Sequence, residues 1–528
     1  MLTTSFGYKG AFTAPHRIAA LAGQSVLAEG GTAVEAMVSA AATIAVVYPH
    51  MNGMGGDGFW LVRRKDESPV GISACGRAAM RATPQWYQDR DCSVIPPRGA
   101  LAAVTVPGTI AGWAKALDLV PEGRRLPLSR LLAPAIDYAA EGIAVSQNQA
   151  VTTAAKLDEL KNVDGFAEIY LPGGAVPTAG SRLRQEALAS TLRHLAKHGL
   201  DSFYRGAIAE ANARFLERAG SPLQLADFNR FDAELVEPLS VTTRWGRLYN
   251  MTPPTQGVSA LMILALYDRL LRDEASCSAD HIHLLVEATK QAFILRNDGL
   301  GDPDHMAEAA STWLAPHRLD ALASQVDRER ALAWPHVAKR GDTIWMGAAD
   351  SEGTVVSFIQ SVFWEFGAGL TSPETGIQFQ NRGSAFSLQP GPNQLRPGAR
   401  PFHTLNPAMA ELQDGRLMAY GTMGGEGQPQ TQAAVFTRHV HHSMPLQAAI
   451  TAPRWLLGRT WGEDSTTLKL EGRFDAQTVE TLRQRGHATE LLADFSDAMG
   501  HAGAAVLHPD GLMEAATDPR SDGAALAF

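Results

Sequence analysis

The chain has 528 residues, 45% of them hydrophobic, and carries a net charge of −9 with a pI near 6.0. This length allows a large buried core, and the acidic balance argues against a nucleic-acid partner, because nucleic-acid-binding proteins present a basic surface. The three cysteines show no C-x-x-C spacing, which excludes a disulfide framework and a zinc finger and is typical of reduced thiols in a cytoplasmic protein.

The sequence shows no sign of a membrane partner. No apolar stretch follows a basic N-terminal start, so no secretory signal is predicted. The most apolar windows, 41–50 and 260–271, are shorter than the roughly 20 residues that a membrane-spanning helix requires. We therefore expect a cytoplasmic protein without membrane segments.

The first part of the chain predicts mainly helices. Apolar residues recur at helical spacing over 14–47, where Gly30 and Gly31 separate two helices. Two strands, 58–64 and 101–108, are expected in the same part. Four further amphipathic helices are predicted at 130–146, 186–199, 207–220 and 279–298.

The last third of the chain changes to short β-branched or aromatic runs between turn residues, which predict strands. Two helices, 444–456 and 476–486, interrupt these strands. Helices and strands in these proportions favour a layered α/β or α+β domain. The expected strands are 343–350, 354–363, 376–381, 416–422 and 504–509.

A Pro- and Gly-rich segment, 387–407, lies among these strands and cannot be one regular element throughout. We interpret it as an ordered functional loop rather than a linker. The Gly-rich "GGDG" (55–58) and "GGEG" (424–427) do not fit nucleotide-binding spacing, and no G-x-S-x-G of a serine hydrolase occurs. The "RHVHH" stretch, with His439, His441 and His442, is interpreted as a surface cluster, and neither a metal nor a cofactor is expected.

Thr343 follows an aspartate in "RGDTIW". A threonine hydroxyl is a weak nucleophile unless a base lies beside it, and an N-terminal threonine can use its own α-amine as that base. A free α-amine has a pKa of about 7.7–8.0, which suits proton transfer at neutral pH. Inside an uncut chain no such amine exists, so local sequence alone leaves Thr343 an ordinary strand residue.

Ordered motifs along nearly the whole chain change this interpretation. "GGTAVEAMVSAAATIAVVYPHMNGMGGDGFWLV", "VTVPGTIAGW", "TPPTQGVSALMIL", "LGDPD", "GDTIWMGAADSEGTVVSF", "FHTLNPAM" and "GTMGGEGQPQ" occur in this order. In sequence and order they resemble the γ-glutamyltranspeptidase family, N-terminal-nucleophile (Ntn) hydrolases made as a single proenzyme. The resemblance implies a four-layer αββα sandwich that forms one structural domain.

The resemblance also implies specific roles for site residues. The Asp342–Thr343 bond would be cut autocatalytically, giving a large subunit, 1–342, and a small subunit, 343–528. Thr343 would be the nucleophile, and Ser361 stands where the family has a second hydroxyl bonded to it. Gly424 and Gly425 stand where backbone N–H groups form the oxyanion hole.

The binding residues depart from the γ-glutamyl pattern. Cys75 stands at the position of the family's carboxylate-binding arginine, with Arg77 two residues further on. Phe363 and Ala385 replace an asparagine and a carboxylate residue that hold the substrate's α-amino group. Two further departures complete the set: His403 and Thr404 replace paired serines, and Arg382 replaces an acidic or amide residue.

These departures predict a binding site with a guanidinium and no aspartate, which would cost a γ-glutamyl substrate several hydrogen bonds of roughly 1.5–3 kcal/mol each. Arg382 suits a compact anionic small-molecule substrate, because its fork binds a carboxylate in a bidentate way. The pattern is similar to the oxamate amidohydrolase branch of the family, which releases oxalate and ammonia late in bacterial allantoin breakdown.

Three alternatives stay open at this point. The chain could act on γ-glutamyl compounds as a hydrolase or transpeptidase, despite the lost binding residues. It could be similar to the cephalosporin acylases, with Phe363 and Trp364 lining an apolar acyl pocket. It could also be an unprocessed, non-catalytic binding protein. Whether a second amine competes with water as acyl acceptor is not decided by the residues.

Overall fold

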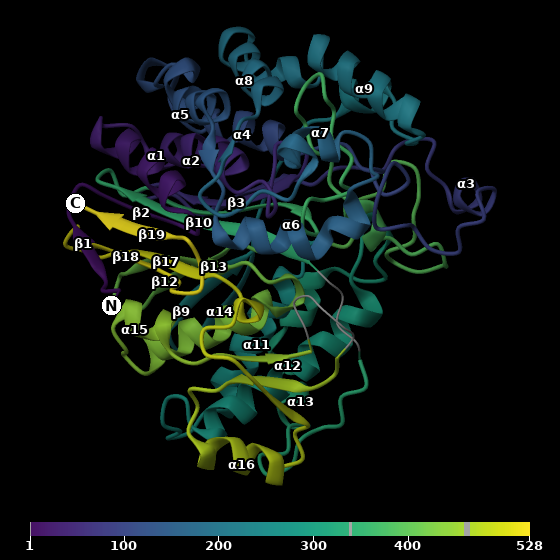
Figure 1. Cartoon of the computed structure of the whole chain (residues 1–528). Coiled ribbons are helices and arrows are strands. Elements are labelled where there is room, and N and C mark those ends of the chain that lie inside the picture. Colours follow the sequence, from purple (N-terminus) through teal and green to yellow (C-terminus); the bar gives the residue numbers. More distant parts are fainter. Residues whose placement is uncertain (1, 337–340, 459–464) are drawn as a thin grey trace.

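Figure 1 shows the computed structural model of the chain, which describes residues 2–336, 341–458 and 465–528. Two antiparallel sheets lie face to face at the centre, and helices cover the outer face of each sheet. These four layers confirm the predicted αββα sandwich. Within the described residues each of the two sheets has seven strands.

The strands of the first sheet lie in the order β1 (Ser5–Gly7), β18 (Met513–Thr517), β17 (Ala502–Leu507), β13 (Leu417–Thr422), β12 (Ala408–Leu412), β9 (Gly246–Asn250) and β8 (Leu239–Thr243). Those of the second sheet lie in the order β19 (Ala524–Ala527), β2 (Gly10–Ala14), β10 (Asp342–Asp350), β11 (Val355–Phe363), β3 (Asp57–Arg63), β4 (Val70–Ala74) and β7 (Glu234–Val236).

The helices that pack on the second sheet come from the N-terminal part of the chain and lie uppermost in Figure 1. They include α1 (Arg17–Ala28), α2 (Ala33–Val47), α4 (Thr109–Leu117), α5 (Leu128–Glu141), α8 (Glu186–His198) and α9 (Ala207–Ala219). Shorter or peripheral helices accompany them: α3 (Pro84–Gln88), α6 (Gln147–Leu160), α7 (Phe166–Tyr170) and α10 (Leu225–Arg230).

The helices on the first sheet form the lower layer in Figure 1. They are α11 (Gly257–Leu270), α12 (Ala279–Gly299), α13 (Pro316–Ala323), α14 (Gln428–Phe436) and α15 (Leu446–Thr451). Helix α16 (Ala476–Gln484) packs below them with a small sheet of β14 (Trp455–Leu457), β15 (Leu468–Glu471) and β16 (Thr489–Leu492). A two-stranded ribbon pairs β5 (Ile143–Ala144) with β6 (Arg182–Leu183).

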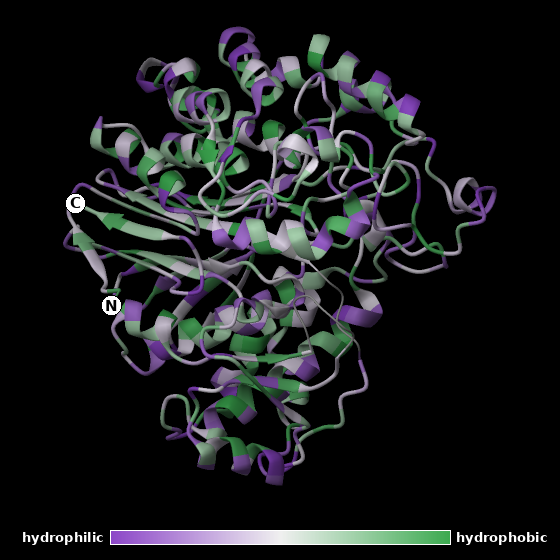
Figure 2. Ribbon diagram, viewed as in Figure 1, coloured by the Kyte–Doolittle hydropathy of each residue, from purple (hydrophilic) through white to green (hydrophobic). Residues whose placement is uncertain are grey.

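The sequence forms these layers because each central strand buries both of its faces. On β10, Met346 and Ala348 contact the helical layer, whereas Trp345 and Ala349 contact the opposite sheet. This alternation follows the two-residue period of a strand. Figure 2 shows hydrophobic residues along the central strands and polar residues on the outer helices. Among the described residues, no helix is both long and apolar enough to span a bilayer.

Most of the predicted elements are confirmed, but two strands are wrong. Residues 101–108 and 376–381 make only isolated bridges, such as Ala78 with Thr105 and Gly55 with Phe379. Their backbone groups bond to loops instead: the N–H of Gly108, for example, donates to the carbonyl of Gly56. The expected helix at 444–456 ends at Thr451 and is followed by strand β14.

The "RHVHH" histidines are not all on the surface, contrary to expectation. A π-helical turn, Thr437–His441, follows α14, and within this stretch His439 is buried whereas His441 and His442 are half-buried. His439 is buried and donates from Nδ1 to the carbonyl of Met444 at 2.9 Å. The ring of His441 packs edge-on against Trp245.

Candidate active site

Three polar side chains, Asp57, Thr343 and Ser361, lie at the same end of three neighbouring strands of the second sheet. Phe59 and Ile359 face the opposite sheet, so by strand alternation Asp57 on β3 and Ser361 on β11 face it too. Asp57 and Ser361 are direct cross-strand partners. Thr343, at the start of the adjacent β10, is completely buried like both of them. The fold therefore gathers a threonine, a serine and an aspartate at one strand end.

The Thr343 hydroxyl lies beside the start of α14. Gln428 Nε2 donates to Thr343 Oγ1 over a long 3.5 Å. The side-chain oxygen of Gln428, Oε1, accepts from Asn406 Nδ2 at 3.0 Å. Asn406 Nδ2 also donates to the backbone carbonyl of Thr404 at 2.9 Å. Amide side chains thus link the nucleophile candidate to the loop that carries Thr404.

Ser361 already accepts one hydrogen bond, from the backbone N–H of Phe363 at 2.7 Å. Its own hydroxyl proton must therefore be directed to a different acceptor. Because β10 and β11 are adjacent strands, the predicted bond between Ser361 and Thr343 is compatible with their placement.

Gly424 and Gly425 form the turn between β13 and α14. Their φ angles of 122° and 51° lie in a region that favours glycine. A Cβ on Gly425 would also lie only 3.0 Å from the carbonyl oxygen of Gly341. Both the backbone conformation and this close approach require glycine, as expected for backbone N–H groups that must come close to a reacting oxygen.

A buried chain of side chains holds this turn in place. Gln256 Nε2 donates to the carbonyls of Gly425 and Thr404, each at 2.8 Å. The Gln256 carbonyl accepts from Arg296 at 2.8 Å, and Arg296 is paired with Glu426 at 2.7 Å. The glycine turn and the loop of Thr404 are therefore fixed to α12 as one unit.

The chain immediately before Thr343 passes through this group. A Cβ on Gly341 would lie 3.0 Å from the Cα of Gly425, and 3.5 Å both from the Phe363 ring and from the Thr404 hydroxyl. In the uncut chain, Gly341 therefore lies against the glycine turn, Phe363 and Thr404.

Arg382 is completely buried and contacts both Phe363 and Thr404. Its Nη1 donates to Thr404 Oγ1 at 3.3 Å, and its Cζ lies 3.8 Å from the centre of the Phe363 ring. Its Nε and Nη2 have no hydrogen-bond partner among the described residues. Burial lowers the pKa of Arg382 to about 9, and the nearby Asp57 opposes this shift. Arg382 is thus a buried cation with unused donors.

Asp57, which the sequence analysis does not assign to the site, lies close to Arg382 and His403. Its Oδ1 accepts from Gln380 Nε2 at 2.9 Å and from the N–H groups of Gly76 and Gly108 at 2.9 and 3.2 Å. Burial raises the pKa of Asp57 to about 7, outweighing the opposing effects of these bonds and of Arg382. The signal in the sequence is the aspartate of "GGDG" (55–58), which lies within the first of the motifs that resemble the family.

His403 contacts the other oxygen of Asp57. The distance from His403 Nε2 to Asp57 Oδ2 is 3.0 Å, and Nδ1 has no partner among the described residues. Burial, with a further contribution from the charge of Arg382, lowers the pKa of His403 well below its usual value. The imidazole is therefore neutral at neutral pH, and its contact with Asp57 is a hydrogen bond rather than an ion pair.

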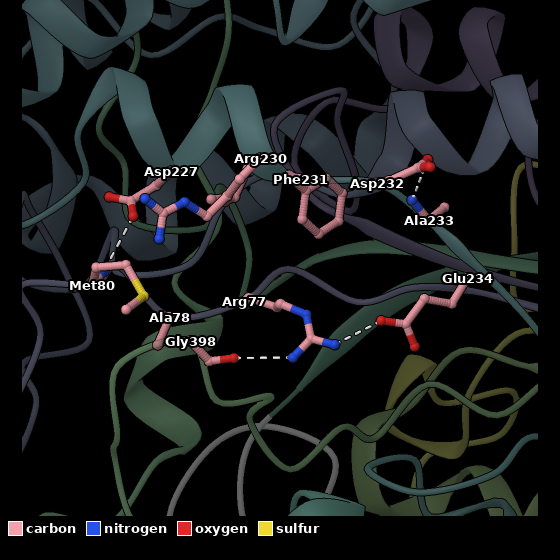
Figure 3. Close-up of a pocket in the computed structure, with 11 residues that line it drawn as sticks. Arg77, Ala78, Met80, Asp227, Arg230, Phe231, Asp232, Ala233, Glu234 and Gly398 are labelled. Carbon is pink, nitrogen blue, oxygen red and sulfur yellow. Dashed lines mark hydrogen bonds and ion pairs between the residues drawn. The ribbon is translucent and has the colours of Figure 1, made fainter.

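Arg77 lies apart from this group. Its guanidinium donates to Glu234 at 2.6 Å and to the carbonyl of Gly398 at 3.1 Å, beside a cavity of about 380 Å³ (Figure 3). Its side chain is 36% exposed, whereas that of Arg382 is fully buried. Of the two arginines considered from the sequence, the structure brings only Arg382 to Thr404 and Phe363.

Within the described part of the chain, two groups of buried side chains have potential metal-ligand atoms within 4.8 Å of one another: Asp57, Cys75 and His403, and His283, Glu287 and His487. In the first group Asp57 is already bonded to Gln380 and close to Arg382. In the second, the Lys290 ammonium lies 2.7 Å from the Glu287 carboxylate. These contacts make each group a hydrogen-bonded network, and we assign a metal to neither.

The arrangement combines three chemical elements. A buried hydroxyl, Thr343, lies at a strand start, and the glycine turn contacts the preceding Gly341. A buried arginine with unused donors contacts Phe363 and Thr404, which also border Gly341. Such a site can attack a carbonyl carbon, stabilise the resulting oxyanion and bind an anionic group on the acyl side.

Comparison with known proteins agrees with this arrangement. Residues 19–528 match the family model described as Gamma-glutamyltranspeptidase. The chain is 51% identical to the oxamate amidohydrolase proenzyme of Klebsiella pneumoniae subsp. pneumoniae, with 100% of each protein covered. It is 38% identical to the glutathione hydrolase-like YwrD proenzyme of Bacillus subtilis, with 99% of each protein covered.

A solved structure gives the same picture of the fold. The crystal structure of cephalosporin acylase from Bacillus halodurans matches with a TM-score of 0.91 at 31% identity, covering 100% of this chain and 97% of that one. The similarity therefore extends over both halves of the sandwich.

Proposed function

The chain belongs to the γ-glutamyltranspeptidase family, and from this premise we propose that it is a self-cleaving amidohydrolase that converts oxamate to oxalate and ammonia. It is a hydrolase of linear amide bonds of the Ntn type. The residues assigned to each step below are part of the proposal.

One observation supports the substrate best: the buried guanidinium of Arg382 has two nitrogens, Nε and Nη2, without a partner among the described residues. Unused donors on a buried cation are costly, so a site of this kind favours an anionic ligand that accepts both bonds. Oxamate carries its carboxylate directly on the amide carbon, which suits an arginine that contacts Phe363 and Thr404, the two residues that border Gly341. The 51% identical relative named for oxamate supports the same substrate.

In the proposed processing step, Thr343 Oγ attacks the carbonyl carbon of Asp342. The peptide C–N bond breaks as the C–O bond forms, and the proton from the hydroxyl goes to the departing nitrogen, which becomes the α-amine of Thr343. Water then hydrolyses the ester, leaving Asp342 as a carboxylate terminus. The products are the subunits 1–342 and 343–528.

In the proposed turnover, the α-amine of Thr343 takes the hydroxyl proton while Oγ attacks the oxamate amide carbon. Backbone N–H groups of Gly424 and Gly425 stabilise the oxyanion, and Ser361 orients the nucleophile. The α-amine of Thr343 then gives this proton to the amide nitrogen of the substrate, which leaves as ammonia. An oxalyl ester remains on Thr343. Water attacks this ester and releases oxalate, while Arg382, Thr404 and His403 hold the carboxylate end.

The two subunits would remain together as a heterodimer. In the second sheet β10 and β11 lie between β2 and β3, which belong to the other proposed subunit. Separating the chains would break ladder hydrogen bonds on both sides of this strand pair. Denaturing and native gels of the same sample test this: two bands in the first and one species in the second are expected. One full-length band in both would instead favour a non-catalytic binding protein.

A second candidate is an acylase for larger acyl groups, because the matching crystal structure is that of a cephalosporin acylase and Phe363 and Trp364 lie at the site. A γ-glutamyl substrate is less well supported, since Phe363 and Ala385 replace the groups expected to bind its α-amino group. Steady-state kcat/KM for oxamate, γ-glutamyl-p-nitroanilide and a glutaryl amide separates the three. Oxamate should be fastest, and a faster rate with either other substrate would refute the oxamate assignment.

The compartment and pathway are also proposed. Three free cysteines, one of them fully buried, are typical of a reducing compartment and support a cytoplasmic location. The chemistry would serve purine catabolism as the last step of allantoin breakdown. Cell fractionation tests the location, and oxamate should accumulate in a deletion strain supplied with allantoin.

A further inference from the structure

Phe363, the last residue of β11, has a conformation that bulky residues rarely adopt. Its φ angle is 84°, and only 3% of the residue is exposed. Strained backbone of this kind persists only where neighbouring groups fix it, and it concentrates at functional sites. Here the Phe363 N–H donates to Ser361 Oγ at 2.7 Å, and the next N–H, of Trp364, donates to Asn381 at 3.0 Å.

This backbone places the Phe363 ring flat against Arg382. The distance from Arg382 Cζ to the ring centre is 3.8 Å, and Thr404 Oγ1 accepts from Nη1 on the same guanidinium. A buried cation on an aromatic face is stabilised by the ring and loses rotational freedom. The ring therefore fixes the position of Arg382 relative to the strand ends.

The same ring also borders the chain that precedes Thr343. A Cβ on Gly341 would lie 3.5 Å from Phe363 Cε2. In the proposed processing step Thr343 attacks the carbonyl of the residue after Gly341, and in turnover it attacks the substrate carbonyl. The path of the chain before Thr343 thus marks the space that an acyl group would occupy, and Phe363 lies beside that space.

We propose that the Phe363 ring is the wall that sets the permitted length of the acyl group. With the ring in place, the carboxylate meets Arg382 only when it is bonded directly to the reacting carbonyl carbon. Monoamides with methylene groups between the two carbons, such as those of malonate and succinate, would place carbon atoms against the ring. Phe363 is in this sense specificity-determining for the reaction, and the inference rests on the proposed function.

The test compares kcat/KM for oxamate and the monoamides of malonate and succinate in the wild type, Phe363→Ala and Phe363→Leu. One methylene in a tight pocket changes relative rates roughly 10- to 200-fold. We expect the ratio of the longer monoamides to oxamate to rise by this factor in both variants. Phe366→Leu is the matched control: Phe366 is also a buried phenylalanine with positive φ, but it packs on Phe166 and Tyr170.

Each outcome bears on one claim. An unchanged length preference in processed Phe363 variants would overturn the inference and leave the proposed function intact. An equal change in Phe366→Leu would also overturn it, because strain rather than the wall would then explain the effect. Loss of self-cleavage in both Phe363 variants would assign the ring a purely structural role. A wild type that is processed but hydrolyses none of the monoamides would refute the proposed function itself.

Discussion

The nucleophile side and the recognition side of the proposed site, named for the roles proposed for Thr343 and Arg382, differ in the groups that form them. Beside Thr343, the Gln428 amide donates to the threonine hydroxyl, Ser361 lies on the adjacent strand, and the glycine turn contacts the preceding Gly341. On the recognition side, next to Phe363, the side chains that lie together are titratable: Arg382, Asp57, His403 and the buried Cys75.

This difference shows how one fold accommodates several substrates. The nucleophile side is fixed by strand ends, backbone groups and the bonds from Gln256, so it depends little on which acyl group is bound. Apart from Asp57 on β3, the recognition side depends on a few side chains outside the strands, which can be exchanged without moving the strands. Substitutions on the two sides should therefore affect different measurements.

The largest effect is expected for Thr343→Ala. Without the hydroxyl the chain should stay uncut, and amidase activity should fall by roughly 10⁶-fold, as when a catalytic nucleophile is removed. Denaturing gels and intact-mass measurement follow the cleavage. Thr354→Ala, in the turn at the other end of the same hairpin, should be processed normally. Cleavage of Thr343→Ala at residue 342 would remove the central assignment.

A smaller and more selective effect is expected for Arg382→Met. The loss of two charge-assisted bonds of about 1.5–3 kcal/mol each should lower kcat/KM for oxamate roughly 10²- to 10⁴-fold while self-cleavage continues. The neutral diamide, oxamide, should be affected far less. Arg77→Met removes only a partly exposed ion pair, worth about 0–1 kcal/mol, and should change kcat/KM within about 5-fold. The reverse order of the two variants would assign the carboxylate to Arg77.

The smallest expected effect is the contribution of Asp57 to the pH dependence of folding stability. Its pKa is raised from 3.8 to about 7, so the folded state binds more protons than the unfolded state across that window. Stability linked to Asp57 is therefore present at low pH and is lost as the pH rises through about 7. Asp57→Asn should remove this dependence, which amounts to about 1–4 kcal/mol.

Thermal unfolding between pH 5 and pH 8 measures this in the uncut Thr343→Ala background. The Tm of the Asp57→Asn protein relative to its parent should rise with pH. The exposed Asp510→Asn serves as the control and should give curves parallel to the parent. Parallel curves for Asp57→Asn as well would show that Asp57 is ionised in both states.

The sequence indicates local backbone geometry better than it indicates contacts between distant side chains, for a physical reason. Gly424 and Gly425 lie in a motif whose glycines permit the positive φ angles that the turn adopts. Asp57 and His403 meet across 346 residues of sequence, and no local pattern encodes that contact. The placement of Arg77 at Glu234 and of Arg382 at Thr404 depends on the same kind of distant packing.

The fold shows a similar division. Long amphipathic helices such as α1, α2 and α12 were predictable because their apolar period extends over several turns. Residues 101–108 and 376–381 have strand-like composition, but their backbone groups bond to loops, which composition alone cannot reveal. The burial of His439 depends on a π-helical turn after α14, for which the sequence gives no clear signal.

The position of β10 within the second sheet has a consequence for the thermodynamics of the mature protein. Before cleavage, both parts of the sheet belong to one chain, so their pairing is an intramolecular reaction. The covalent link gives each part a high effective concentration near the other. After the proposed cleavage, the same ladders between β2, β10, β11 and β3 would join two separate chains. The stability of the mature form then depends on its concentration, whereas that of the precursor does not. The covalent link therefore serves mainly during folding, and dilute refolding should succeed with the uncut chain and fail with the cut one.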